Sequence, residues 1–92
     1  MSEAIEAEVV IQNRLGLHAR PAAAFVKITN RYHSEITVSR KDLQVNGKSI
    51  MGVMMLGASQ GSQLHLCARG KDAKALIQEL VDLVNRKFNE PS

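Results

Sequence analysis

The chain has 92 residues, a length that suits one domain and is too short for two. Hydrophobic residues make up 45% of it and aromatic residues only 3%, so Val, Leu, Ile, Ala and Met must supply the core. Twelve Lys and Arg against nine Asp and Glu give a formal net charge of +3. This mild excess suits acidic partners and anionic groups without demanding nucleic acid.

Cellular location is predicted from cysteine content and from the N-terminal segment. Cys67 is the single cysteine, which excludes an internal disulfide and fits a reducing compartment. Residues 1–8 contain three glutamates and lack the apolar run of a signal peptide. No apolar stretch approaches the roughly 20 residues of a membrane helix. We expect a cytoplasmic protein that does not insert into membranes.

The first half of the chain predicts a strand, a glycine turn and a helix. Residues 6–13 alternate between apolar and polar, which indicates a half-buried strand. A turn follows at 13–16, where Gly16 can adopt a positive φ. Residues 19–30 predict a helix, because Ala22, Phe25, Val26 and Thr29 recur at helical spacing and the alanines favour a helix.

The second half predicts three more strands and two more helices. Strands are expected at 34–40, at 43–45 and at 63–68, with a short helix at 50–56 that Gly57 ends. A final helix is expected over 73–87, with Asp72 as its N-cap. The resulting order, β-α-β-β-α-β-α, favours an antiparallel sheet covered by helices on one face, in a single domain over residues 1–92.

Chemistry is concentrated in the segment LGLHARPAAAF, in which His18 lies between a glycine turn and a predicted helix. The first N–H groups of a helix are unpaired and its N-terminus is electropositive, so this position suits an anion. Arg20 adds a guanidinium that matches phosphate oxygens, and Pro21 is tolerated in a first helical turn. Imidazole is both a good nucleophile and, once protonated, a good leaving group. From this pattern alone, a phosphoryl carrier and an ordinary surface histidine both remain open.

The same segment resembles the active-site signature of the HPr family, the histidine phosphocarriers of the phosphoenolpyruvate-dependent phosphotransferase system. The matching stretch is GLHARPAAAFV, which places the phosphoryl-bearing histidine on His18, the family arginine on Arg20 and its proline on Pro21. A second stretch, NGKSIMGVMMLGASQGS, places the regulatory serine on Ser49. The resemblance spans nearly the whole chain. It implies an α+β, open-faced β-sandwich with a four-stranded antiparallel sheet and three helices on one face.

The resemblance also implies a function and a set of partners. Enzyme I would donate a phosphoryl group from phosphoenolpyruvate to Nδ1 of His18, and a IIA domain would receive it. The protein would act as a monomer and a carrier, with no turnover of its own and no cofactor. An HPr kinase/phosphorylase modifies the serine in some members only, so for Ser49 both this role and that of a helix N-cap stay open. Sugar-uptake and nitrogen-branch carriers share the signature, and the sequence does not separate them.

Further candidates are a docking surface and two histidines. The family's docking patch falls on Ile50, Met51 and Met54, although core packing is the alternative for an apolar helix. Lys27 is a candidate for contact with acidic partner groups or an ordinary solvated lysine. His33 and His65 match no site, and no spacing of His, Cys or carboxylates predicts a metal.

Two other classes of function compete with the carrier. A small α/β RNA-binding module is permitted by the positive charge, but the predicted strands lack aromatic residues for base stacking. A regulatory relative that only docks is disfavoured by the presence of His18.

Overall fold

The structure is a computed structural model that describes residues 3–90. Its strands are β1 (Ala4–Val10), β2 (Glu35–Arg40), β3 (Leu43–Asn46) and β4 (Gln63–Arg69). They form one antiparallel sheet in the order β1-β4-β2-β3. The helices are α1 (Ala19–Thr29), α2 (Ile50–Met55), α3 (Ala73–Asn85) and a 3-10 turn, η1 (Lys87–Asn89).

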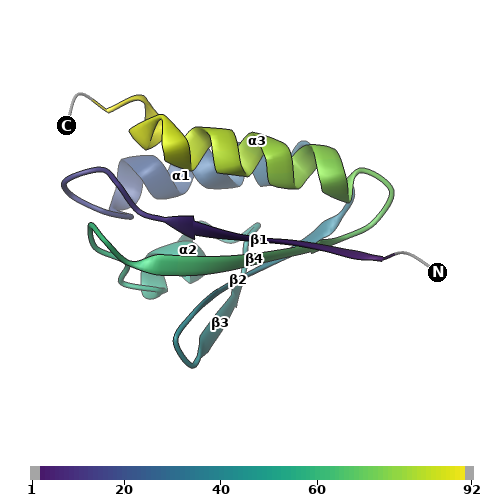
Figure 1. Cartoon of the computed structure of the whole chain (residues 1–92), viewed down its shortest axis with the longest axis horizontal. Coiled ribbons are helices and arrows are strands. Elements are labelled where there is room, and N and C mark those ends of the chain that lie inside the picture. The colour runs from purple at the N-terminus through teal and green to yellow at the C-terminus, as the bar shows by residue number, and fades with distance from the viewer. Residues whose placement is uncertain (1–2, 91–92) are drawn as a thin grey trace.

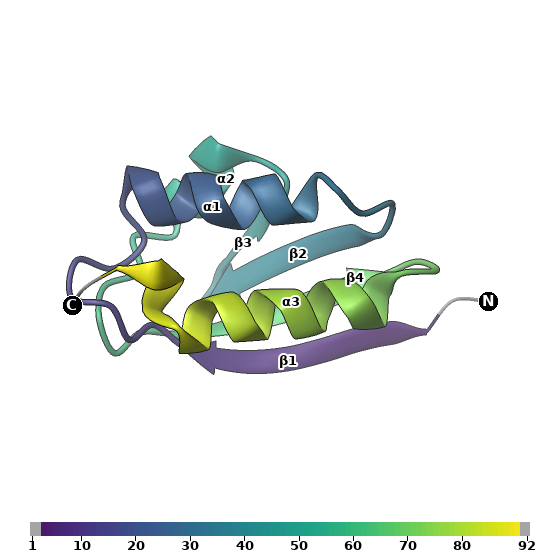
Figure 2. The ribbon, with the colours of Figure 1, turned by 90° about the horizontal axis from the view of Figure 1, so that it is seen from above.

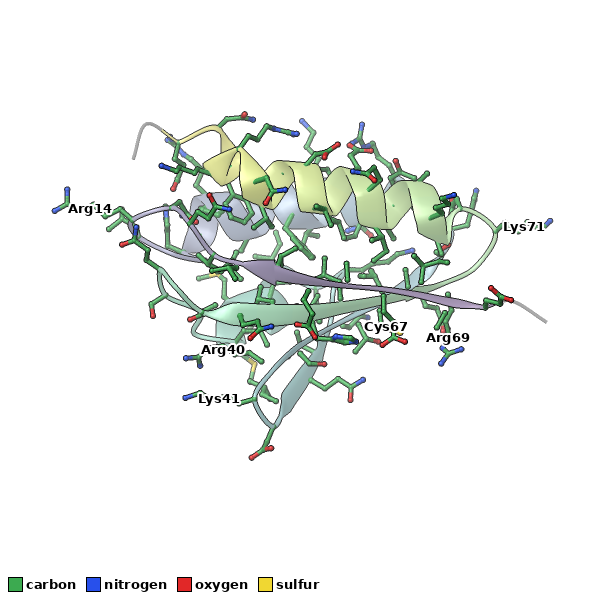
Figure 3. All side chains as sticks on the ribbon, viewed as in Figure 1. Arg14, Arg40, Lys41, Cys67, Arg69 and Lys71 are labelled. Carbon is green, nitrogen blue, oxygen red and sulfur yellow. The ribbon has the colours of Figure 1, made fainter. Side chains whose placement is uncertain are left out.

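The helices lie on one side of the sheet. Figure 1 shows α1 and α3 over the sheet, and Figure 2 shows α2 beside α1, on the side away from α3. Among residues 3–90, no helix covers the opposite face, and Cys67 and Arg69 of β4 lie on it (Figure 3). The predicted α+β architecture, with a four-stranded antiparallel sheet and three helices, is therefore confirmed.

The core lies between the sheet and the two long helices. Alternate residues of β4 (Leu64, Leu66 and Ala68) are buried because successive strand side chains point to opposite faces. The predicted apolar face of α1 is also confirmed, since Ala22, Phe25, Val26 and Thr29 are all buried. The Thr29 hydroxyl donates to the carbonyl oxygen of Gly47 at 2.8 Å, which satisfies this polar group inside the core.

Two predicted boundaries were wrong. The first strand ends at Val10 rather than Asn13, because its pairing with β4 stops at Val10 opposite Gln63. Helix α3 ends at Asn85 rather than residue 87, because the chain enters a left-handed turn there. Asp72 is the N-cap residue of α3, as predicted, but its carboxylate accepts no hydrogen bond from the helix. It accepts instead from the Ser34 hydroxyl and from the backbone N–H of His33 and Ser34.

These contacts of Asp72 have an electrostatic consequence. The hydrogen bond from the Ser34 hydroxyl, followed by that from the His33 N–H, lowers the pKa of Asp72 to about 2. The carboxylate thus joins the start of α3 to the segment that leads into β2.

Within residues 3–90, no helix is long and apolar enough to cross a membrane.

Candidate functional site

His18 is positioned by a tight turn that packs against the segment following α2. Gly16 has φ +70°, and a Cβ atom there would lie 2.3 Å from the carbonyl oxygen of Ala58. The next residue, Leu17, is buried and donates its N–H to that same oxygen at 2.9 Å. Only glycine permits both the left-handed conformation and this close approach of two backbones. The predicted positive φ at Gly16 is confirmed.

His18 is the N-cap residue of α1, as the sequence predicted. Its backbone is extended, and its carbonyl oxygen accepts the first helical hydrogen bond from Ala22 N at 3.0 Å. Its side chain caps no N–H of the helix. In the part of the chain that the structure describes, the N–H groups of Ala19 and Arg20 meet no acceptor. Two oriented donors are thus available beside the imidazole at the electropositive end of an 11-residue helix.

Arg20 lies in the first turn of α1 and is exposed. Within residues 3–90 it forms no ion pair, so its guanidinium is not committed to a carboxylate. Arg14, in the turn before His18, points away from the body of the molecule (Figure 3). The arginine singled out by the sequence therefore lies within two residues of His18, on the same helix terminus.

The sequence did not predict that Glu90 would contact His18. Nε2 of His18 lies 3.0 Å from Oε2 of Glu90. The other oxygen, Oε1, accepts a 2.9 Å hydrogen bond from the side-chain amide of Asn13. That amide also donates to the carbonyl oxygen of Gly16 at 2.8 Å. The imidazole is 37% exposed and the Glu90 side chain 14%, whereas Asn13 is fully buried.

Glu90 reaches His18 because the chain reverses after α3. Lys87, Phe88 and Asn89 have φ values of 56°, 56° and 61°, a left-handed run without a glycine. Each such residue costs about 1–2 kcal/mol relative to the right-handed form. The turn is held by Phe88, which is buried in the core. Backbone strain of this kind persists only where surrounding contacts compensate for it, and it is typical of functional sites.

The residues of the predicted docking patch are exposed and so do not belong to the core. Exposed fractions are 44% for Ile50, 76% for Met51 and 41% for Met54. Leu15, in the turn before His18, and Met55, at the end of α2, are exposed as well. Lys27 is exposed on α1.

Ser49 has the structural role that the sequence allowed for it. Its hydroxyl oxygen accepts a 3.0 Å hydrogen bond from Gly52 N, which caps α2. It is partly exposed and directly precedes Ile50 and Met51. A helix cap is thus its observed role, and regulation stays a prediction.

His65 lies on the helix-free face and takes no part in the site around His18. Its Nδ1 is 2.8 Å from Glu8 and its Nε2 is 2.7 Å from Glu6. The hydrogen bond with Glu8, followed by that with Glu6, raises the pKa of His65. Among residues 3–90, no three His, Cys, Asp or Glu side chains are arranged to hold a metal ion.

Comparisons with known proteins give a family for this chain. The family model for the PTS HPr component phosphorylation site matches residues 5–86. The phosphocarrier protein HPr of Pseudomonas aeruginosa is 46% identical over 84 residues, which cover 90% of this chain and 93% of that protein.

Solved structures agree with this assignment. An HPr structure from Thermoanaerobacter tengcongensis superposes with a TM-score of 0.92 at 46% identity, covering 96% of this chain and 99% of that one. A second structure from that organism, described as an HPr dimer, has a TM-score of 0.76 at 49% identity and covers 89% and 94% of the two chains. The monomeric state expected for this chain therefore stays a prediction. On the match of its sequence, its fold and its histidine-bearing helix terminus, the chain belongs to the HPr family of phosphocarrier proteins of the phosphotransferase system.

Proposed function

We propose that His18 accepts a phosphoryl group on Nδ1 from phosphorylated enzyme I and passes it to IIA domains. The observation that carries this proposal is the position of the imidazole at the N-terminus of α1, beside the unpaired N–H groups of Ala19 and Arg20. These donors and the helix dipole favour a phosphoryl dianion on the ring. The protein is then a cytoplasmic carrier without turnover of its own.

Arg20 stabilises the phosphoryl group in this proposal. An exposed guanidinium with no carboxylate partner among the described residues is free to turn toward an anion on the neighbouring ring. Its planar fork matches two phosphoryl oxygens, which a lysine cannot do. Arg20 therefore lowers the energy of the phosphorylated state without reacting itself.

Partners dock on the apolar surface of α2 in this proposal. Leu17, next to His18, is hydrogen-bonded to Ala58, so the segment that follows α2 lies against the histidine turn. A partner that covers Ile50, Met51 and Met54 is thus brought beside the imidazole. Lys27, on the exposed side of α1, adds a contact for acidic groups. Flexible methionines suit a surface that must accept both a donor and an acceptor protein.

Ser49 offers a means of regulation at the same surface. A phosphate at a helix N-cap meets free N–H groups and the positive end of the dipole, so α2 should stay folded. The same charge would disturb an apolar interface at Ile50 and Met51. Ser49→Asp is expected to slow phosphoryl uptake while leaving the circular dichroism spectrum unchanged, and a wild-type rate would leave Ser49 as a cap alone.

One incubation tests the proposed function. The protein, enzyme I and phosphoenolpyruvate are mixed, and the intact mass is followed. We expect one added phosphoryl group that is lost in acid and kept in base, and no addition to His18→Ala. Addition of a IIA domain should then remove the group. Undiminished labelling of His18→Ala would contradict the proposal, as would an RNA-binding activity in place of labelling.

A further inference from the structure

We propose that Glu90 is a positioning residue that, held by Asn13, keeps the proton of the His18 imidazole on Nε2 and so leaves Nδ1 unprotonated. The structural basis is a pair of hydrogen bonds of the Glu90 carboxylate, 2.9 Å to Asn13 and 3.0 Å to Nε2 of His18. That the free Nδ1 is the reactive atom rests on the proposed function.

The direction of each hydrogen bond follows from the chemistry of the groups. An ionised carboxylate can only accept hydrogen bonds, so Nε2 of His18 must be the donor. A neutral imidazole has a single ring proton. If that proton lies on Nε2, Nδ1 retains its lone pair, and within residues 3–90 no group donates to Nδ1.

The orientation of the Asn13 side chain is also determined. Its Nδ2 group faces two acceptors, the carbonyl oxygen of Gly16 and Oε1 of Glu90. A flipped amide would place its oxygen against both acceptors, which is repulsive. Asn13 is fully buried, and its Oδ1 has no partner within the described structure. A buried polar atom without a partner is costly, so the arrangement is maintained by the two bonds that Nδ2 makes.

Phosphoryl transfer to Nδ1 of His18 and from it to an acceptor requires no proton transfer at the ring. The Nδ1 lone pair attacks phosphorus, and the bond between phosphorus and the donor breaks with its electron pair remaining on the donor. The product is a ring with a phosphoryl dianion on Nδ1 and a proton on Nε2, whose positive charge faces Glu90. When the acceptor attacks phosphorus, the N–P electron pair returns to Nδ1, and the ring is again neutral with its proton on Nε2. Glu90 thus favours the protonated phosphoimidazole, which is the better leaving group.

Substitution of Glu90 by glutamine separates this role from a structural one. Glutamine has nearly the same shape, and its carbonyl oxygen must face Asn13, because Nδ2 of Asn13 is a donor. Its NH2 group then faces Nε2 of His18, which must accept and therefore lose its proton to Nδ1. Alanine removes the acceptor without adding a donor. A positioning role predicts that glutamine is more harmful than alanine, whereas a packing role predicts the opposite.

The experiment combines nitrogen NMR with transfer kinetics on the full chain. In the wild type, the 15N shifts of neutral His18 should identify Nε2 as protonated and Nδ1 as unprotonated. Glu90→Gln should invert this assignment and lower the rate of phosphoryl uptake from enzyme I by more than about tenfold, as a reversed tautomer does in other catalytic histidines. Glu90→Ala should give a mixture of tautomers and a smaller loss. The matched control is Glu35→Gln, which makes the same charge change at the first residue of β2. This position follows the C-terminal end of α1, whereas His18 precedes its N-terminal end.

The outcomes separate this inference from the proposed function. The tautomer is read in the free protein and needs no phosphoryl donor. Wild-type tautomer and wild-type rate in Glu90→Gln, with labelling of His18 intact, would overturn the inference and leave the function standing. A wild type that resists labelling while glutamine inverts the tautomer would overturn the function and leave the role of Glu90 intact. Loss of rate in Glu90→Ala greater than in Glu90→Gln would assign Glu90 to packing.

Discussion

Replacement of Gly16 by alanine is expected to destabilise the protein and to displace His18. The left-handed conformation at φ +70° costs a residue with a Cβ about 1–2 kcal/mol. The new atom would also lie 2.3 Å from the oxygen of Ala58 and 2.8 Å from Cα of Ser59, both of them backbone atoms. Because backbone cannot rotate away as a side chain would, the two loops must separate.

Separation of the loops breaks the hydrogen bond from Leu17 to Ala58 inside the protein. A buried group left without its partner costs about 1–3 kcal/mol. The sum is about 2–5 kcal/mol, a large part of the roughly 5–15 kcal/mol that stabilises a typical domain. Urea unfolding measures this change, and phosphoryl uptake measures the displacement of His18.

The matched control is Gly57→Ala. Gly57 also has a positive φ, of +59°, but a Cβ there meets nothing within 4 Å. The Gly57→Ala protein should therefore lose only about 1–2 kcal/mol of unfolding free energy, the conformational cost, and should keep the wild-type rate of phosphoryl uptake. Equal losses for the two variants would refute the argument that the close approach of two backbones positions the histidine turn.

Three further predictions address the surface and the charges. Met51→Glu should leave the melting temperature unchanged, because the side chain is 76% exposed, and should weaken partner binding by about 1–2 kcal/mol; unfolding would place Met51 in the core. Asp72→Asn should lower the free energy of unfolding at neutral pH, where the Asp72 carboxylate is ionised in the folded and unfolded states. Because the folded pKa is lowered to about 2, this stabilisation is lost as the pH falls from the unfolded pKa through the folded one, and the difference from wild type should shrink. A pH-independent difference would contradict this. His65→Gln should lower the free energy of unfolding most at pH values below the unfolded pKa of about 6.5. The difference from wild type should fade as the pH rises through the raised folded pKa of His65. A difference that grows with pH would contradict the pairing with Glu6 and Glu8.

Much of the fold could be predicted from local patterns. Alternation in β4 and the apolar face of α1 identify buried residues because each depends on a short repeat along the chain. The position of His18 immediately before α1 follows from the glycine turn before it and Pro21 after it. The exposure of Met51 was expected, since a helix as short as α2 cannot bury every apolar side chain.

The contact between Glu90 and His18 could not be predicted. It depends on three left-handed residues, Lys87 to Asn89, none of which is glycine and of which only Asn89 is of a type that favours turns. The periodic pattern of α3 instead favoured a helix through residue 87. Asn13 was placed in a strand for a similar reason, although the register of β1 and β4 excludes it. Both errors concern places where tertiary contacts outweigh local propensity.

The central claim is that the phosphoryl group is carried by Nδ1 of His18. NMR of the 15N-labelled protein, phosphorylated by enzyme I and phosphoenolpyruvate, tests it most directly, because a scalar coupling between phosphorus and a ring nitrogen identifies the bonded atom. We expect one phosphorus signal coupled to Nδ1 of His18, with the proton retained on Nε2, and its disappearance when a IIA domain is added. A phosphoryl group bonded to Nε2 of His18, or to His33, His65 or Ser49, would contradict the account.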